Sequence, residues 1–258
     1  MTAPNAKFRS AVKDAIKWIV ACCLCPLALG WVTAASLAET SVVTANVTVA
    51  RANGSPRTDT DNGIVVWLTP IPAQPAPVTR RNDAVRPRIV QKNKRFETRL
   101  LAVEVGSTVD FPNKDPFFHN VFSLFDGRKF DLGLYEAGAN RSVKFDKAGI
   151  CYIFCNIHSQ MSAVVVVVDT PYFVKMDMPG EFRIEELPYG RYQLNVWAER
   201  CAPETLKAAS RQITVDGPRV TLPPIQLRES RDLITVHPNK HGKDYETPVF
   251  SSPIYTQP

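Results

Sequence analysis

The sequence predicts an all-β protein that contains two β-sandwiches. Short apolar or alternating runs recur along most of the chain, and clusters of Gly, Asn, Asp and Pro separate them. Many short strands at such spacing are typical of sandwiches and barrels. The 21 Pro residues among 258 argue further against long helices, because Pro disrupts a helix interior.

The strand-like runs extend from residue 42 to residue 227. The run 163–168 is apolar at every position, which favours a central strand covered on both faces. A single helical turn is expected within 202–210. The predicted strands are 42–50, 63–69, 88–92, 100–105, 108–111, 120–124, 141–145, 150–155, 162–169, 182–185, 191–197, 211–215 and 219–227.

Composition and charge exclude two classes of protein. Hydrophobic residues make up 45% of the chain and charged residues 22%, so the chain is globular rather than disordered. The formal net charge is +6, but the first 38 residues hold four cations and one carboxylate. The remainder carries 27 basic and 24 acidic residues, an excess too small to indicate a phosphate-binding surface. We therefore expect no nucleic-acid partner.

Residues 1–38 have the pattern of an export signal. Four basic residues precede the uncharged segment 18–38, which ends in the small-residue motif Ser36-Leu37-Ala38. This order predicts a cleaved signal peptide and a periplasmic or other extracytoplasmic location. The 21 uncharged residues of this segment are also long enough to span a bilayer as an uncleaved anchor. Only in that case do we expect membrane association.

The cysteines point to a role other than disulfide formation. Cys22, Cys23 and Cys25 belong to the signal, so the exported part keeps Cys151, Cys155 and Cys201. Three cysteines in an exported protein are not a disulfide framework, and at least one thiol is expected to do something else.

The strongest functional signal is a set of four potential metal ligands. Cys155, His158 and Met161 form a Cys-x2-His-x2-Met segment at the end of a predicted strand, and His119 directly precedes another. Two His and one Cys with a weak axial Met are the ligands of mononuclear electron-transfer copper sites. The soft thiolate and thioether suit Cu(I), the imidazoles suit both oxidation states, and a zinc site would not use Met.

The spacing of the ligands is consistent with one site. Three ligands within seven residues must lie on a tight loop, because a continuing strand would point Cys155 and His158 to opposite faces. His119 is remote in sequence and would complete the site from a neighbouring strand end.

Residues 86–170 resemble the cupredoxins, the blue type 1 copper proteins, and within them the plastocyanin- and amicyanin-like group. Besides the Cys-x2-His-x2-Met loop and the Phe-His-Asn-Val segment at 118–121, the family's V-x-x-G-x-x-V-x-F-x-N opening is matched by Val103, Gly106, Val109, Phe111 and Asn113. The resemblance implies a Greek-key β-sandwich that holds one copper ion through His119, Cys155, His158 and Met161.

The resemblance also implies roles for two neighbouring positions. Asn120 would tie the two ligand segments together by hydrogen bonds, and His158 would be the more exposed ligand, through which electrons pass. The loop departs from the amicyanin-like pattern because Asn156, Ile157, Ser159 and Gln160 flank His158 where Pro is usual.

Cys151 opens two alternatives. The segment Cys151-x3-Cys155-x2-His158 nearly matches the dinuclear copper loop of oxidase subunits, but it is one residue shorter. Four residues of strand separate the two thiols by roughly 13 Å, too far to share a copper pair. Cys151 is otherwise expected in the core or in a disulfide with Cys201.

A second sandwich is predicted around the copper domain. Its segment 180–196 resembles the transthyretin-like, or carboxypeptidase regulatory-like, fold at Gly180, Phe182, Ile184, Leu187, Pro188, Gly190, Tyr192, Leu194 and Val196. We expect this domain to combine residues 41–75 and 171–228, with the copper domain (86–170) inserted. The alternative is two sequential domains, with 41–75 as extra strands of the copper domain. The Pro-rich stretch 70–77 has the composition of a connector, and 229–258 that of a disordered tail.

The predicted function is one-electron transfer by an exported blue-copper protein. Expected partners are redox proteins, such as a c-type cytochrome or a dehydrogenase, docked on Pro116, Phe117, Phe118 and Ile157. A multicopper enzyme is not expected, because the chain has only four His. The alternative is a copper storage, delivery or interaction protein without electron relay.

Overall fold

The computed structural model describes residues 39–59, 63–73, 86–124, 128–230 and 239–243. Within these ranges every regular element is a β-strand except one helix, α2 (Pro203–Ala209), and this confirms the all-β prediction. No helix in the described ranges combines the length and the apolar character that crossing a bilayer requires. The predicted export signal lies outside the described residues.

One sheet is organised around the first strand, β1 (Thr40–Ala50). It pairs antiparallel with β13 (Gly180–Pro188) and parallel with β16 (Arg219–Thr221) and β17 (Ile225–Arg228). The first strand is therefore bound on both edges by strands that follow it by more than a hundred residues.

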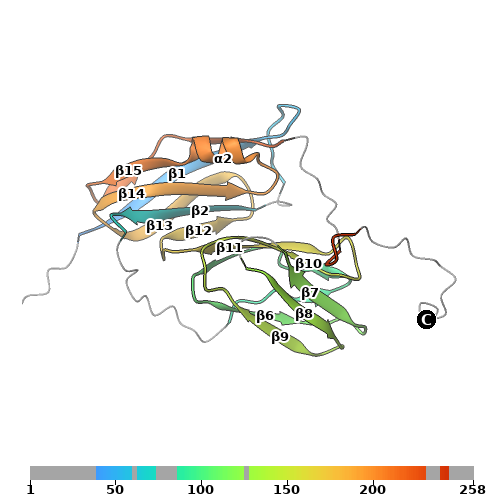
Figure 1. The fold of residues 1–258 in the computed structure, drawn as a ribbon. Helices are drawn as coiled ribbons and strands as arrows, with labels where there is room; N and C mark the ends of the chain where they lie inside the picture. Colours follow the sequence, from blue (N-terminus) through green and yellow to red (C-terminus); the bar gives the residue numbers. More distant parts are fainter. Residues whose placement is uncertain (1–38, 60–62, 74–85, 125–127, 231–238, 244–258) are drawn as a thin grey trace, which may run out of the picture. The chain divides into compact units, whose positions relative to one another are not determined.

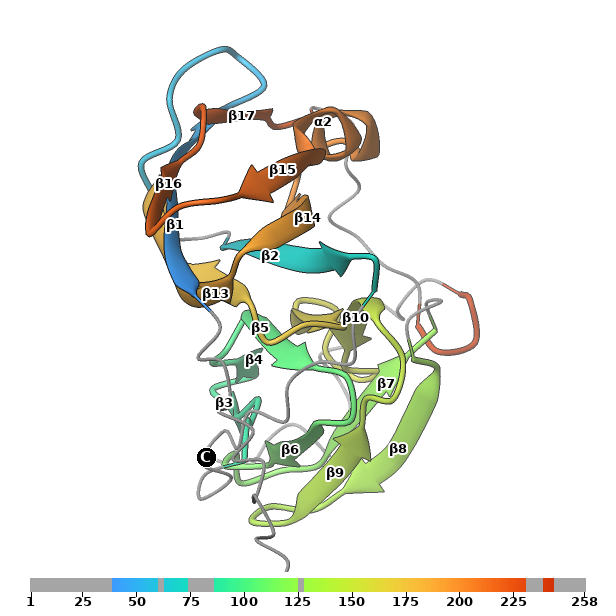
Figure 2. The same cartoon turned by 90° about the vertical axis from the view of Figure 1, so that its left-hand side faces the viewer.

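A second sheet has the order β12-β2-β14-β15 and is antiparallel throughout. Its strands are β2 (Ile64–Ile71), β12 (Phe173–Met176), β14 (Gly190–Ala198) and β15 (Arg211–Val215). Together these two sheets are called the split sandwich here, because the blue and teal strands β1 and β2 lie among orange strands from the other end of the chain (Figures 1 and 2).

The core of the split sandwich follows the two-residue period of its strands. In β1 alternate residues are buried, from Val43 to Val49, and they join one apolar cluster with Leu68 of β2 and Leu194 of β14. Side chains of both sheets thus form a single hydrophobic core.

We predict that Leu194→Ala lowers the free energy of unfolding by about 2–5 kcal/mol, because Leu194 is fully buried and truncation leaves a cavity. The measurement is urea unfolding followed by circular dichroism. The control is Arg191→Ala, at an exposed position of the same strand, which is expected to change stability little. A similar effect of both substitutions would contradict the assigned core.

Strands of the middle of the chain form the central sandwich. Its main sheet has the order β5-β11-β10-β7-β8, in which only β5 and β11 pair in parallel. The strands are β5 (Leu100–Glu104), β7 (His119–Ser123), β8 (Phe130–Tyr135), β10 (Gly149–Phe154) and β11 (Ser162–Val168).

Two antiparallel pairs complete the central sandwich. They are β6 (Thr108–Pro112) with β9 (Asn140–Lys144), and the short hairpin β3 (Gln91–Lys92) with β4 (Arg95–Phe96). Phe111 of β6 and Ile153 of β10 lie fully buried in the same apolar cluster, so the β6–β9 pair and the main sheet enclose one core.

The strand β11 has two buried faces, as predicted. Alternate residues Ala163, Val165 and Val167 belong to the core of the central sandwich. The other face contributes Val164, Val166 and Val168 to a separate cluster, which also contains Leu100 of β5, Val65 of β2 and Trp197 of β14. A strand apolar at every position is suited to this place, since neither face meets water.

The elements differ from the predicted ones in several places. The helix α2 extends over seven residues and begins with Pro203 at its first position, where the missing N–H costs nothing. The strands β4, β8 and β12 are absent from the predicted set: β4 and β12 have only two and four residues, and β8 contains Asp131 and a glycine with φ of +67°. The predicted strand 219–227 is divided into β16 and β17, and of the predicted strand 88–92 only residues 91–92 form a strand.

Candidate metal centre

Three of the four predicted ligands come together at one end of the central sandwich. The Sγ atom of Cys155 lies 3.7 Å from Nδ1 of His119 and 3.7 Å from Nδ1 of His158. All three donor atoms lie within 4.8 Å of one another, although 36 residues separate His119 from Cys155. Strand pairing explains this approach: His119 begins β7, Cys155 follows β10, and these strands are antiparallel neighbours.

The loop from Cys155 to Met161 is closed by its own backbone. The N–H of Cys155 donates to the carbonyl of Met161 at 3.3 Å, and the N–H of Met161 donates to the carbonyl of His158 at 3.0 Å. Met161 is fully buried in the apolar cluster that also contains Cys155. The structure therefore places Met161 in the same loop as Cys155 and His158, and in the same apolar cluster as Cys155.

The surroundings of Cys155 suit a thiolate that binds a cation. Burial raises the pKa of the Cys155 thiol, while hydrogen bonds from the backbone N–H groups of Asn120, Ile157 and His158 act in the opposite direction. Three donors directed at one sulfur stabilise negative charge on it. A bound metal ion would offset the remaining cost of burying that charge.

The ring of His158 is set up to be neutral. Burial, followed by the electrostatic effects of His119 and Lys94, lowers the pKa of His158 to about 4, while Asp115 acts in the opposite direction. A neutral imidazole keeps a nitrogen lone pair for a metal at neutral pH.

A buried carboxylate, which the sequence motifs do not predict, contacts the ring of His119 on the side away from Cys155. Nε2 of His119 lies 2.8 Å from Oδ2 of Asp115, whose side chain is 4% exposed. Burial alone would raise the pKa of Asp115, but hydrogen bonds from the Lys94 N–H, the His119 ring and the Asn93 N–H outweigh it and lower that pKa. In the sequence, this contact is indicated by the position of Asp115 four residues before His119.

Asn120 links the two ligand segments through its backbone rather than its side chain. Its N–H is directed at the Cys155 sulfur, whereas its Nδ2 donates to Oδ1 of Asp131 at 2.6 Å. Asp131 belongs to β8, so the expected tie between the ligand segments is made by the main chain.

Part of the predicted tail bonds to the ligand loop. The backbone N–H of Lys240 donates to Oδ1 of Asn156 at 2.9 Å, and its Nζ lies 2.9 Å from Oδ2 of Asp131. In Figure 1 this segment, 239–243, is drawn in red beside β10. The sequence predicts disorder from about residue 229, whereas 239–243 make specific contacts here. Residues 231–238 and 244–258 lie outside the described residues.

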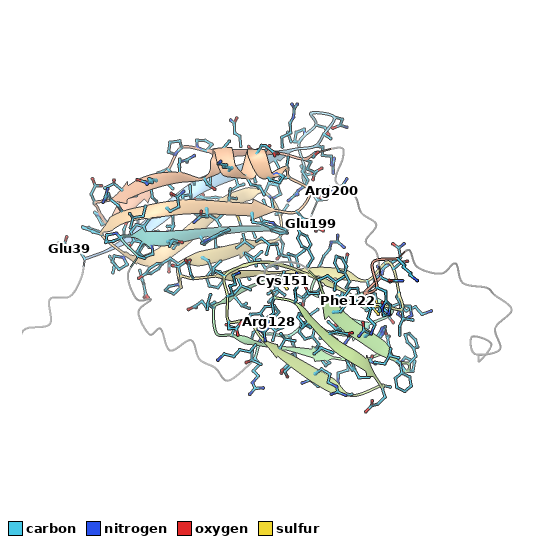
Figure 3. The ribbon with its side chains drawn as sticks, in the orientation of Figure 1. Glu39, Phe122, Arg128, Cys151, Glu199 and Arg200 are labelled. Atoms are coloured by element: carbon cyan, nitrogen blue, oxygen red, sulfur yellow. The ribbon has the colours of Figure 1, made fainter. Side chains whose placement is uncertain are left out.

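Cys151 is not part of the metal cluster found among the described residues. Its Sγ lies 3.2 Å from Oγ of Ser123 and 3.3 Å from the carbonyl oxygen of Arg128. Figure 3 labels Cys151 and Arg128 in the central sandwich. Cys201 is buried as well, and burial raises its pKa to about 11. Cys151 and Cys201 are not joined by a disulfide. The sequence allows Cys151 to be a ligand of a dinuclear copper site, a disulfide partner of Cys201 or a core residue, and the structure favours the core position.

The four residues expected at a docking surface divide into two kinds. Phe117 is half-buried, and its ring centroid lies 5.2 Å from that of His119 and 5.8 Å from that of His158. Phe118 is 56% exposed, Ile157 is 36% exposed and Pro116 is exposed. Phe117 therefore forms a wall of the site, while the other three lie at the surface.

The donor set fits a copper ion. Two imidazole nitrogens and one sulfur converge in a site where His119 and Cys155 are fully buried. Copper is bound by this combination of ligands in electron-transfer proteins, whereas ions that prefer oxygen ligands, such as Mg²⁺ and Ca²⁺, find no such donors among the three.

Comparisons with known proteins identify likenesses of limited extent. No protein-family model and no curated protein matches the chain. A reduced Cu(I) form of an amicyanin variant is 26% identical, over 32% of this chain and 82% of that chain, with a TM-score of 0.31. A purple cupredoxin from Nitrosopumilus maritimus is 21% identical, over 32% of this chain and 99% of that chain, with a TM-score of 0.29.

Proposed function

We propose that this chain is an exported type 1 blue-copper protein that carries single electrons between extracytoplasmic redox partners, and that it is not an enzyme. The ligands would be His119, Cys155 and His158, with Met161 as the weak axial ligand. The observation that carries the proposal is the convergence of one sulfur and two Nδ1 atoms within 4.8 Å.

A bound copper ion would supply a Cu(II)/Cu(I) couple at this place. The chain's own residues would hold the donors in fixed positions. The backbone hydrogen bonds of the Cys155–Met161 loop, and the N–H groups directed at the Cys155 sulfur, oppose movement of the ligands. A site that keeps its shape in both oxidation states needs little reorganisation, which favours rapid electron transfer.

His158 is the proposed point of electron passage. It is only half-buried, whereas His119 is fully buried. The exposed residues Pro116, Phe118 and Ile157 lie next to the ligands in sequence and would form an apolar contact surface. We propose a redox protein, such as a c-type cytochrome or a dehydrogenase, as the partner that docks there.

We further propose that the split sandwich is a transthyretin-like domain into which the copper domain is inserted. Support comes from β1 and β2, which precede the central strands yet pair with β13, β14 and β12, which follow them. This arrangement favours insertion over two sequential domains. The proposed role of the split sandwich is that of a scaffold or docking module.

The deciding experiment is titration of the metal-free protein with copper. We expect one copper ion per chain, an intense visible thiolate-to-copper band, and reversible bleaching by a one-electron reductant. Binding without the band and without reversible cycling, together with rapid loss of copper to a chelator, would instead support the storage or delivery alternative. No stoichiometric binding would contradict both.

A further inference from the structure

The proposed electron-transfer role uses Nδ1 of His119, and the other ring nitrogen has a buried carboxylate as its partner. Nε2 faces Oδ2 of Asp115 at 2.8 Å, and both side chains are removed from water. Burying the carboxylate of Asp115 costs free energy unless hydrogen bonds compensate its charge. The hydrogen bonds that Asp115 accepts therefore indicate what the carboxylate does at this site.

The carboxylate is held by backbone donors from the β3–β4 hairpin. The N–H of Asn93 donates to Oδ1 at 2.6 Å, and the N–H of Lys94 donates to Oδ2 at 3.0 Å. From its own segment, the N–H of Asp115 donates to Oδ1 of Asn113 at 3.0 Å. The Asp115 side chain is thus fixed in position before any metal binds.

Both donor residues lie in the turn of the hairpin and have positive φ. Asn93 and Lys94 have φ values of 54° and 55°, the left-handed region that a two-residue turn of this type requires. Asn tolerates this region, whereas in Lys the Cβ atom comes too close to the backbone, which costs free energy. Strain of this kind persists where the surrounding structure requires the conformation, often at functional sites.

The same turn also touches the wall of the metal site. Nζ of Lys94 lies 5.4 Å from the centroid of the Phe117 ring, which packs against the rings of His119 and His158. One hairpin therefore supports the site at two points.

The protonation of His119 follows from this geometry. An ionised carboxylate can only accept hydrogen bonds, so Nε2 must carry the proton that lies between the two groups. In the neutral ring Nδ1 then keeps its lone pair, and this atom lies 3.7 Å from the Cys155 sulfur. The carboxylate selects the tautomer that a metal at Nδ1 needs.

We propose that Asp115, held by the β3–β4 hairpin, is a positioning and tuning residue of the metal centre. It fixes His119 as the Nε2–H tautomer, and its negative charge, placed one imidazole ring from the metal, favours Cu(II) over Cu(I). The tuning part rests on the proposed copper-binding function, whereas the tautomer part concerns the metal-free chain.

The test has a metal-free arm and a copper arm. Nitrogen-15 NMR of the metal-free protein reports the His119 tautomer in the wild type and in Asp115→Asn and Asp115→Ala. We expect Nε2–H in the wild type and a mixture of tautomers in Asp115→Ala. In the copper arm we expect Cu(II) affinity to fall about 10- to 100-fold in both variants. The Cu(I)-to-Cu(II) affinity ratio should rise about tenfold, a potential increase of about 59 mV for one electron.

Two control variants separate this role from general effects. Asp177→Asn removes an exposed negative charge far from the cluster in sequence, and we expect neither arm to change. Asn93→Gly keeps the N–H donor, and glycine adopts the left-handed conformation freely, so the tautomer should be retained and stability should not fall.

The possible failures are distinguishable. An Nδ1–H tautomer in the wild type, or an unchanged tautomer in Asp115→Ala, would overturn the positioning role even if copper binds normally. Unchanged potentials in both Asp115 variants would overturn the tuning role. If the wild type binds no copper, the proposed function fails, and the metal-free arm still decides whether Asp115 positions His119.

Discussion

Replacing Cys155 with Ser is expected to abolish the visible copper–thiolate band and to weaken copper binding more than about 100-fold. The sulfur of Cys155 lies at the centre of the cluster, at 3.7 Å from both Nδ1 atoms. Losing an outer partner of a ligand already costs about 10- to 100-fold in affinity, so losing the ligand itself must cost more. Optical titration with copper and competition with a chelator measure the two effects.

The other described cysteines provide matched controls. Cys151 and Cys201 are as buried as Cys155, but neither belongs to the cluster found among the described residues. Cys151→Ser and Cys201→Ser should keep the band and the affinity, with thermal unfolding used to check that each variant folds. Loss of the band in a folded Cys151→Ser variant would contradict a site with a single thiolate. It would instead support a dinuclear copper site that includes Cys151.

Breaking the buried ion pair between Arg57 and Glu229 is expected to cost about 3–5 kcal/mol of unfolding free energy. Their charged groups lie 3.3 Å apart, with 1% and 7% of the side chains exposed. Arg57 follows β1 and Glu229 follows β17, and each makes a backbone hydrogen bond to the end of β1. Either single substitution, Arg57→Met or Glu229→Leu, removes one charge of the pair and keeps the other charge buried.

Urea unfolding of the single and double variants tests this prediction. Arg57→Met combined with Glu229→Leu should recover most of the lost stability, because a buried pair replaced by apolar groups is often neutral. Arg183→Met is the control, since its pair with Glu185 is more than half exposed and should contribute little. Additive losses in the double variant would contradict the assigned pairing. The pair also shows that Glu229, at the start of the predicted disordered tail, has a defined place.

The sequence by itself determined the class of fold and one half of the candidate site. Alternation of apolar residues, as in β1, encodes which face of a strand is buried, since side chains alternate across the backbone. The spacing of Cys155, His158 and Met161 places them on one loop, because only a few bonds of chain separate them. These features are local, and backbone geometry alone is enough to derive them.

The tertiary structure decided which distant groups complete the site. Pairing of β7 with β10 brings His119 to Cys155, and the β3–β4 hairpin brings two N–H donors to Asp115. The side of β10 on which Cys151 lies, and the contact of Lys240 with Asn156, likewise depend on how separate segments pack. Strand register and packing are properties of the whole chain in space, so no spacing of residues along one segment encodes them.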